Sequence, residues 1–222
     1  MTVPFFADSA TLCRSAFIGG LMRILAALFA LIAATTAPLT AFADAQVGGA
    51  APDFRLQDAN GKETSLSQFK GKTVVLEWFN PGCPFVKKFY SGGDMQRFQK
   101  EVVGKGGVWL TIASSAEGKP GYISLQDAPK AVSSMDLQST ALLLDPKGTT
   151  GRAYGARTTP HMYVVNPAGT LVYAGAIDST PSTDSDDIPG ATNYVLNAVD
   201  GIAKGKDFDP VSTDPYGCSV KY

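Results

Sequence analysis

The sequence is poor in side chains that bind metals or carry redox chemistry, with one histidine and three cysteines in 222 residues. Cys13 falls in an N-terminal segment that we expect to be removed. The remaining Cys83, Cys218 and His161 cannot form a closed four-ligand zinc site from cysteine and histidine alone. An excess of charge is also missing, because the net charge is −1. That balance gives no indication of a nucleic-acid partner.

Internal repeats and domain-sized linkers are absent as well, and the length allows one domain or at most two. The N-terminal residues 1–43 have the pattern of a signal peptide. Arg23 precedes an apolar run over residues 24–34 that is too short to span a bilayer comfortably, and an Ala-Phe-Ala site ends at Ala43. We expect export to the periplasm, or secretion, without stable membrane insertion after cleavage; the alternative is an uncleaved anchor.

The most informative stretch surrounds Cys83. An apolar run over residues 73–76 predicts a buried strand, and Asn-Pro-Gly at 80–82 ends it. Pro84 suits the first position of a helix. Cys83 is therefore expected at a helix N-terminus, where the helix dipole favours a thiolate, with Lys87 adding positive charge one turn later. A thiolate is a nucleophile, although a small buried residue at a strand end is the alternative interpretation.

Further elements follow in alternation. After one helix running to about residue 103, we expect strands at 108–112 and 141–144, helices near 125–135 and 149–154, and a hairpin formed by 158–165 and 171–174. A last helix covers about 194–202. The strand–helix–strand order predicts a parallel crossover. We place the domain at 44–205 and treat 206–222 as a C-terminal tail that carries Cys218.

This order of elements resembles the thioredoxin superfamily, with Cys83 at the strand–helix turn and Thr159–Pro160 opening a later strand. The chain looks like an exported redoxin of the AhpC/TSA type, which is peroxiredoxin-like, and the Ala-Pro-Asp-Phe at 51–54 is similar to the lead-in of redoxins. The resemblance implies an α/β thioredoxin fold: a central mixed sheet flanked by helices, with an N-terminal hairpin extension. It also implies that Pro160 is cis and lies against Cys83.

Two positions depart from the family patterns. Val86 stands where thioredoxins carry the second cysteine of Cys-x-x-Cys, so no local dithiol exists. Asn80 stands where peroxiredoxins carry threonine or serine, and neither Arg152 nor Arg157 clearly matches their peroxide-binding arginine. The resemblance thus leaves open whether the substrate is a disulfide or a peroxide.

Cys218 is the candidate resolving cysteine, because it can attack an oxidised Cys83 and close a disulfide. The alternative is a permanent structural disulfide, which an exported chain with two cysteines also allows. His161 is either a base or ligand near Cys83 or an ordinary strand residue. Acidic residues between 178 and 187 suggest a solvated loop rather than a calcium site.

We therefore expect an exported thiol oxidoreductase with Cys83 and Cys218 as catalytic residues, supported by Pro84, Lys87, Thr159 and Pro160. No cofactor and no bound metal are expected. The partners would be a thiol/disulfide redox protein or a small-molecule oxidant, and not nucleic acid. The alternative function is a non-catalytic module of the same fold that binds a metal such as copper through Cys83, His161 and Met162.

Overall fold

The computed structural model describes residues 1–2, 45–205 and 211–222. The chain divides into two units, Met1–Ala41 and Phe42–Tyr222, and the second contains the folded domain. The signal peptide expected at 1–43 lies almost wholly outside the described residues. None of the described helices combines the length and the apolar character needed to cross a membrane.

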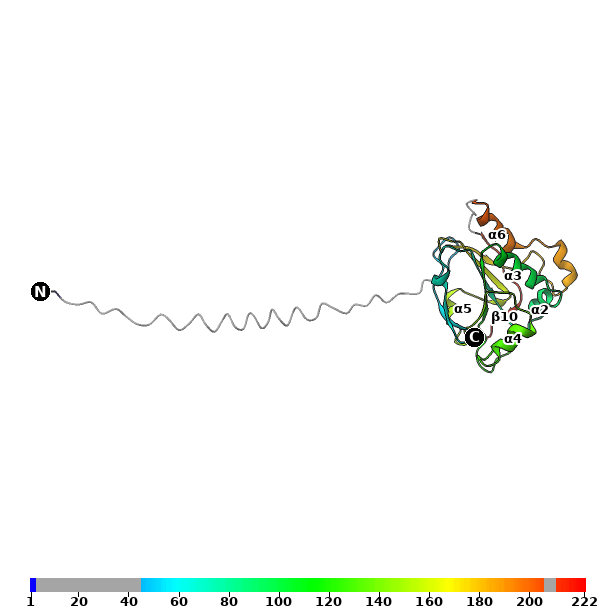
Figure 1. The fold of residues 1–222 in the computed structure, drawn as a ribbon, viewed down its shortest axis with the longest axis horizontal. Coiled ribbons are helices and arrows are strands. Elements are labelled where there is room, and N and C mark those ends of the chain that lie inside the picture. Colours follow the sequence, from blue (N-terminus) through cyan, green and yellow to red (C-terminus); the bar gives the residue numbers. More distant parts are fainter. Residues whose placement is uncertain (3–44, 206–210) are drawn as a thin grey trace. The chain divides into compact units, whose positions relative to one another are not determined.

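The domain is built on one mixed sheet of eight strands in the order β2-β1-β5-β4-β3-β7-β8-β9 (Figure 1). The strands are β1 Arg55–Asp58, β2 Glu63–Ser65, β3 Val74–Trp78, β4 Val108–Ala113, β5 Ala141–Leu144, β7 His161–Val165, β8 Leu171–Gly175 and β9 Val211–Ser212. β3 is parallel to β4 and antiparallel to β7. β1 and β2 form the expected N-terminal hairpin. β3, β4 and β7 are buried along their whole length, as expected for strands covered on both faces.

Within the described part of the chain, five α-helices and two short 3₁₀ helices accompany the sheet. They are η1 Leu66–Phe69, α2 Pro84–Ser91, α3 Asp94–Gly104, α4 Ala128–Ser134, α5 Thr149–Ala153, η2 Ser185–Gly190 and α6 Tyr194–Ala203. Figure 1 shows α2, α3 and α6 together on one side of the sheet and α5 apart from them. The expected thioredoxin fold, with a mixed sheet flanked by helices, is confirmed.

The single helix expected from Pro84 to about residue 103 is wrong. Two helices, α2 and α3, are separated by Gly92 and Gly93. Gly93 has φ 83°, a left-handed conformation that glycine adopts at little cost. The break changes the direction of the chain, so that both helices pack on the sheet. It also ends α2 only about two turns after Cys83.

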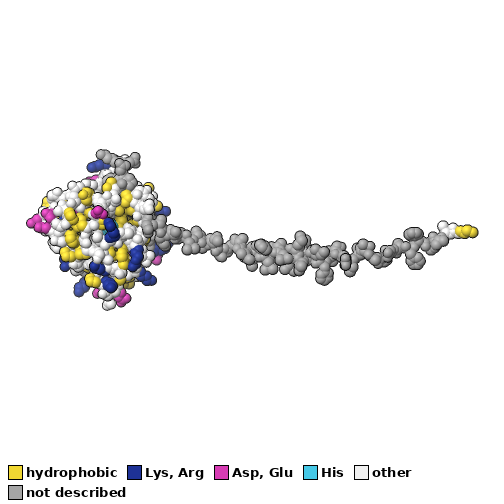
Figure 2. All heavy atoms as spheres, turned by 180° about the vertical axis from the view of Figure 1, so that it is seen from behind, with side chains coloured by type: hydrophobic (Ala, Val, Ile, Leu, Met, Phe, Trp, Pro, Cys, Tyr) yellow, Lys and Arg dark blue, Asp and Glu magenta, His cyan; other side chains and the backbone are white. Residues whose placement is uncertain are grey.

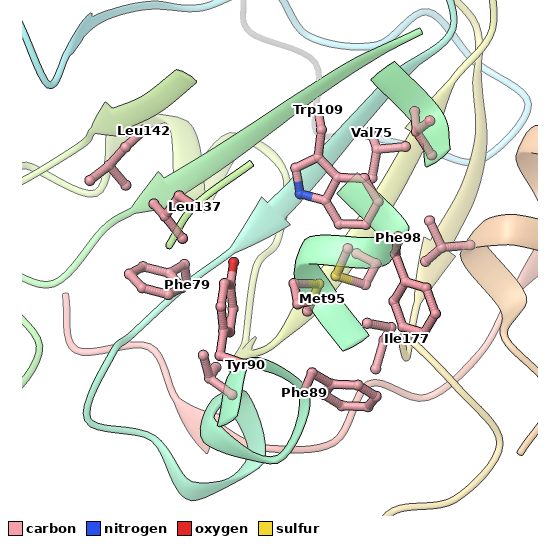
Figure 3. Packing of buried hydrophobic residues seen from close by; sticks show 14 of the residues in the cluster. Val75, Phe79, Phe89, Tyr90, Met95, Phe98, Trp109, Leu137, Leu142 and Ile177 are labelled. Atoms are coloured by element: carbon pink, nitrogen blue, oxygen red, sulfur yellow. The ribbon is translucent and has the colours of Figure 1, made fainter. Parts of the chain in front are cut away.

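Each face of the sheet has its own core. Figure 3 shows the larger core, where Val75 and Trp109 from the sheet meet Phe89 of α2 and Met95 and Phe98 of α3. The smaller core, on the opposite face, contains Val74, Leu76, Trp78, Tyr154 and Tyr163 among others. Successive residues of β3 thus alternate between the two cores, as the pleat of a strand requires.

The tail, for which no periodicity was visible, is docked on the domain. Residues 211–212 form β9 beside β8, and Cys218–Ser219 form β10, which pairs antiparallel with β6 Thr158–Thr159. At the C-terminus, Tyr222 donates its hydroxyl to the Ala156 carbonyl at 2.7 Å. Residues 211–222 are therefore paired with the domain, although the sequence placed them in a tail outside it.

Charge is distributed without a dominant sign. On the face seen in Figure 2, lysine and arginine side chains are scattered among acidic, polar and apolar ones. This distribution agrees with the net charge of −1.

Candidate active site

Cys83 lies at the junction that the sequence predicts, between β3 and α2. It is the N-cap residue of α2, and Pro84 occupies the first helical position. The Cys83 carbonyl accepts hydrogen bonds from the backbone of Val86 and Lys87 at 3.1 and 2.9 Å. The side chain is buried, with 2% of its surface exposed. The local sequence thus places the sulfur at a helix N-terminus but hides it from solvent.

The peptide bond between Thr159 and Pro160 is cis, as the resemblance implied. The Thr159 carbonyl oxygen lies 3.0 Å from the Cys83 sulfur. A residue 76 positions away in the sequence is thereby brought directly to the thiol.

Cys218 completes the cluster. Its backbone pairs with Thr159 in the ladder between β6 and β10, and its sulfur lies 2.6 Å from the sulfur of Cys83. Both are thiols in this structure. Cys218 is only partly buried, so it is the more accessible sulfur. The two cysteines that the sequence could not pair with certainty are neighbours in space.

The pKa values of the two thiols move in opposite directions. Burial raises the pKa of Cys83, but hydrogen bonds from the Cys218 thiol and neighbouring backbone outweigh it, so this pKa is lowered overall. Burial, the hydrogen bond to Cys83 and its negative charge raise the pKa of Cys218 to about 11. Cys83 is therefore the more acidic thiol of the pair, and Cys218 is the less acidic one.

Lys87 does not take the position expected of it. It is exposed on α2, and it is not among the main causes of the pKa shift of Cys83. Its neighbour Lys88 is the buried lysine, with a side chain 0% exposed. The Cys83 pKa is lowered mainly by the Cys218 thiol, a group far away in the sequence.

Asn80 supports the turn before Cys83. Its side-chain oxygen accepts a hydrogen bond from the Gly82 N–H at 2.8 Å, and its amide donates to the Pro120 carbonyl at 3.2 Å. A Cβ on Gly121 would overlap this amide, so glycine is needed there for the loop to approach. Asn80 thus joins the turn to the loop around residue 120.

The four arginines of the described residues are engaged away from Cys83. Arg55 pairs with Glu63, Arg97 with Asp94 and Arg157 with Asp214, while Arg152 lies 4.5 Å from the Tyr222 ring centroid. None of them is among the main causes of the pKa shift of Cys83.

His161 faces away from the cysteines. It shares its face of β7 with Tyr163, and the two ring centroids are 4.5 Å apart. The His161 Nδ1 accepts the Arg157 backbone N–H at 3.2 Å. Burial, followed by the charge of Arg157, lowers its pKa to about 3, so the ring is neutral. Met162 packs in the core that contains Cys83, whereas His161 pairs with Trp78 of β3 and stacks on Tyr163 at the opposite core, so the copper ligand set is not assembled. The described residues also contain no cluster of three or more metal-binding side chains.

Sequence reasoning missed three residues beside the cysteines: Lys88, Asp178 and Tyr216. Asp178 was expected in a solvated acidic loop, but it is 3% exposed and pairs with Lys88. It also accepts a hydrogen bond from the Tyr216 hydroxyl. Tyr216 stands two positions before Cys218. This nearness in the sequence is the one feature that could have pointed to a place in the site.

Together, the order of the strands, the cis bond before Pro160 and the adjacent cysteines define a thioredoxin-fold protein. The chain belongs to the AhpC/TSA family, which matches residues 47–174. This confirms the resemblance that Cys83 and the Thr159–Pro160 pair suggested.

Individual relatives carry both kinds of thiol chemistry in their names. The chain is 29% identical over 127 residues to the thiol-disulfide oxidoreductase ResA of Bacillus subtilis, covering 56% of this chain and 64% of ResA. It is 48% identical over 48 residues to a chloroplastic peroxiredoxin Q of Populus jackii, covering 20% of this chain and 22% of that protein. The matches thus span less than two thirds of these curated relatives. An uncharacterized conserved protein of Geobacillus kaustophilus shares the fold, with a TM-score of 0.66, 23% identity, and coverage of 80% and 92% of the two chains.

Proposed function

We propose that the protein is an exported thiol–disulfide oxidoreductase in which Cys83 is the nucleophile and Cys218 the resolving cysteine. The observation that carries this proposal is the pair of sulfurs 2.6 Å apart, one at a helix N-terminus and the other on a docked tail. The opposite shifts of their pKa values support the assignment of the two roles.

The reaction begins with the Cys83 thiolate. It attacks one sulfur of a substrate disulfide, forms a mixed disulfide and expels the other substrate sulfur as a thiolate. The Cys218 thiol then loses its proton to solvent and attacks the Cys83 sulfur. This step closes the Cys83–Cys218 disulfide and expels the second substrate thiolate. The substrate gains two electrons, the protein pair loses two, and a thiol partner later reduces the protein again.

The first step also prepares the second. Two of the causes that raise the pKa of Cys218 are the hydrogen bond to Cys83 and its negative charge. Both are lost once Cys83 is bound in a mixed disulfide. The pKa of Cys218 then falls, and a larger fraction of it is nucleophilic at neutral pH.

A disulfide substrate is favoured over a peroxide by the surroundings of Cys83. Asn80 is occupied by the turn and the loop around Pro120, and the described arginines lie elsewhere. A thiol peroxidase is the second candidate function, and the local identity to peroxiredoxin Q favours it. In that case the Cys83 thiolate would attack one peroxide oxygen, break the O–O bond and become a sulfenic acid, while the other oxygen leaves as water or an alcohol. Cys218 would then attack the Cys83 sulfur and expel water as the disulfide closes.

Export follows from the pattern of residues 1–43, and it would place the pair in an oxidising compartment. The partner would then be an exported thiol or disulfide protein, and no cofactor is required. The mature chain would begin near Asp44.

The test compares Cys83→Ser and Cys218→Ser. We expect Cys83→Ser to abolish reduction of a disulfide substrate and to trap no adduct. Cys218→Ser should retain the first attack and accumulate a mixed disulfide on Cys83, located by mass mapping without reductant. If Cys83→Ser kept full activity, or both variants only lost stability to a similar degree, the pair would be a structural disulfide. Replacing the disulfide by hydrogen peroxide in the same assay decides between the two candidate substrates.

A further inference from the structure

A buried ion pair lies next to the tail that carries Cys218. The Lys88 side chain of α2 is 0% exposed and that of Asp178, just after β8, is 3% exposed, with Nζ and Oδ2 3.6 Å apart. Lys88 also donates to the Thr180 carbonyl at 3.0 Å and to the Ser182 hydroxyl at 3.3 Å. Burying two charges is costly, and an apolar pair of similar volume often serves packing equally well. This ion pair therefore calls for a role beyond filling space.

Tyr216 connects the ion pair to the tail. Its hydroxyl donates to the Asp178 Oδ1, and its ring meets Phe85 edge-on with centroids 5.8 Å apart. The Lys88 Nζ lies 5.9 Å from the centroid of the same ring. Burial, followed by the hydrogen bond to Asp178, raises the pKa of Tyr216 well above its usual value. The hydroxyl thus remains a donor over the pH range in which the protein works.

The position of Tyr216 determines where Cys218 lies. Only Gly217 separates them, and it passes so close to β6 that a Cβ there would overlap the Thr159 carbonyl oxygen. The ladder that holds Cys218 is only two residue pairs long, Cys218 with Thr159 and Ser219 with Thr158. On the C-terminal side of Cys218, Val220 donates its N–H to the Arg157 carbonyl at 3.0 Å, and on the N-terminal side Tyr216 donates to Asp178.

We infer that Lys88, Asp178 and Tyr216 form a positioning anchor that keeps the Cys218 sulfur against Cys83. This inference rests on the proposed role of Cys218 as the resolving cysteine. Closure of the disulfide is an intramolecular step, and its rate depends on how much of the time the two sulfurs are held in reach of each other. α2 presents both Cys83 and Lys88, so the helix that carries the nucleophile also holds the tail that resolves it.

The test is Tyr216→Phe, which keeps the ring and removes the hydroxyl. The reduced protein is mixed with the aromatic disulfide 5,5′-dithiobis(2-nitrobenzoate) in a stopped-flow instrument. The attack of Cys83 releases one thionitrobenzoate, and closure by Cys218 releases a second. Hydrogen bonds to charged groups are strong enough that we expect closure to slow by about tenfold or more in Tyr216→Phe. The first release should slow less than closure, because attack depends on Cys218 only through the pKa of Cys83.

The matched control is Tyr154→Phe, which removes a hydroxyl that donates to the Pro52 carbonyl at 2.7 Å, away from the anchor. Its closure rate should remain within about twofold of the wild-type rate, since the two sites share no contacts. Equal slowing in the two variants, or no slowing in Tyr216→Phe, would overturn the anchor. If Tyr216→Phe folds poorly, Asp178→Asn gives the second measurement, and it too should slow closure more than attack. A wild-type protein that never releases the second thionitrobenzoate through Cys218 would instead refute the proposed function itself.

Discussion

Glu77 is a carboxylic acid at the centre of the larger core, completely buried on β3. It accepts hydrogen bonds from Trp109 at 2.8 Å, Tyr90 at 2.9 Å, Thr111 at 3.2 Å and Gln99 at 3.3 Å. Burial raises its pKa to about 6 against the opposing effect of these bonds. The residue therefore titrates close to the working pH although it touches no solvent.

This shift predicts a pH dependence of stability. Between pH 4.5 and 6 the folded state binds more protons at Glu77 than the unfolded state, so the free energy of unfolding should decrease as pH rises. A shift of this size corresponds to about 2 kcal/mol. The low pKa of His161 makes stability rise with pH over the same range, so Glu77 is isolated by comparing the wild type with Glu77→Gln. In urea unfolding from about pH 4 to 8, the difference in free energy of unfolding between the wild type and Glu77→Gln should decrease by this amount as pH rises. The exposed Glu63→Gln is the control, and its pH dependence should match that of the wild type. An unchanged slope in Glu77→Gln would contradict the assignment.

The residues of the site differ in how well their positions could be predicted from the sequence. Cys83, Pro84 and the Thr159–Pro160 pair could be recognised because their positions depend on local turn and cap chemistry. Lys88 could not, since nothing in two adjacent lysines shows which one a neighbouring segment will bury. The pairing with Cys218 depends on contacts 135 positions apart.

At the scale of elements, the apolar runs were sufficient to locate the central strands, and the strands at 108–112 and 141–144 agree closely with β4 and β5. The division into α2 and α3 was missed because the apolar pattern continues through Gly92 and Gly93. The strands of the tail were missed because two-residue ladders have no periodicity. Both β9 and β10 exist through tertiary pairing alone.

A substitution at Gly217 can test whether the tail is docked on the domain. Its φ is 142°, and a Cβ there would overlap the Thr159 carbonyl. Gly217→Ala should therefore release the tail. We expect iodoacetamide to modify Cys83 at least several-fold faster in the reduced variant, and the free energy of unfolding to fall by roughly 1–3 kcal/mol.

Gly104→Ala is the matched control, because it lies in the last turn of α3 with no atom within 4 Å of the added Cβ. It should leave the alkylation rate of Cys83 unchanged and raise stability slightly, since alanine favours helix more than glycine does. An alkylation rate in Gly217→Ala equal to that of the control would show that the tail does not cover Cys83.

At the scale of the whole molecule, a Cys83–Cys218 bond would join the first turn of α2 to a tail almost at the end of the chain. It would close a loop of 135 residues, which in the chain-entropy model stabilises the oxidised protein by about 5 kcal/mol. A structural disulfide and a redox-active disulfide would both provide this stabilisation. They differ in whether the native protein undergoes thiol–disulfide exchange at this bond without unfolding.

The partial exposure of Cys218 and the lowered pKa of Cys83 predict such exchange in the native state. A glutathione thiolate can attack the Cys218 sulfur, and Cys83 leaves readily because a thiol of low pKa is a good leaving group. The reduction rate of the oxidised protein should therefore be nearly constant as urea is increased up to the unfolding transition. A permanent structural disulfide would be reduced only through unfolding, and its rate would rise steeply with urea over the same range. A steep rise of the reduction rate with urea would refute the redox role of the pair. A reduction rate that does not change with urea would exclude a disulfide that is reduced only after the protein unfolds.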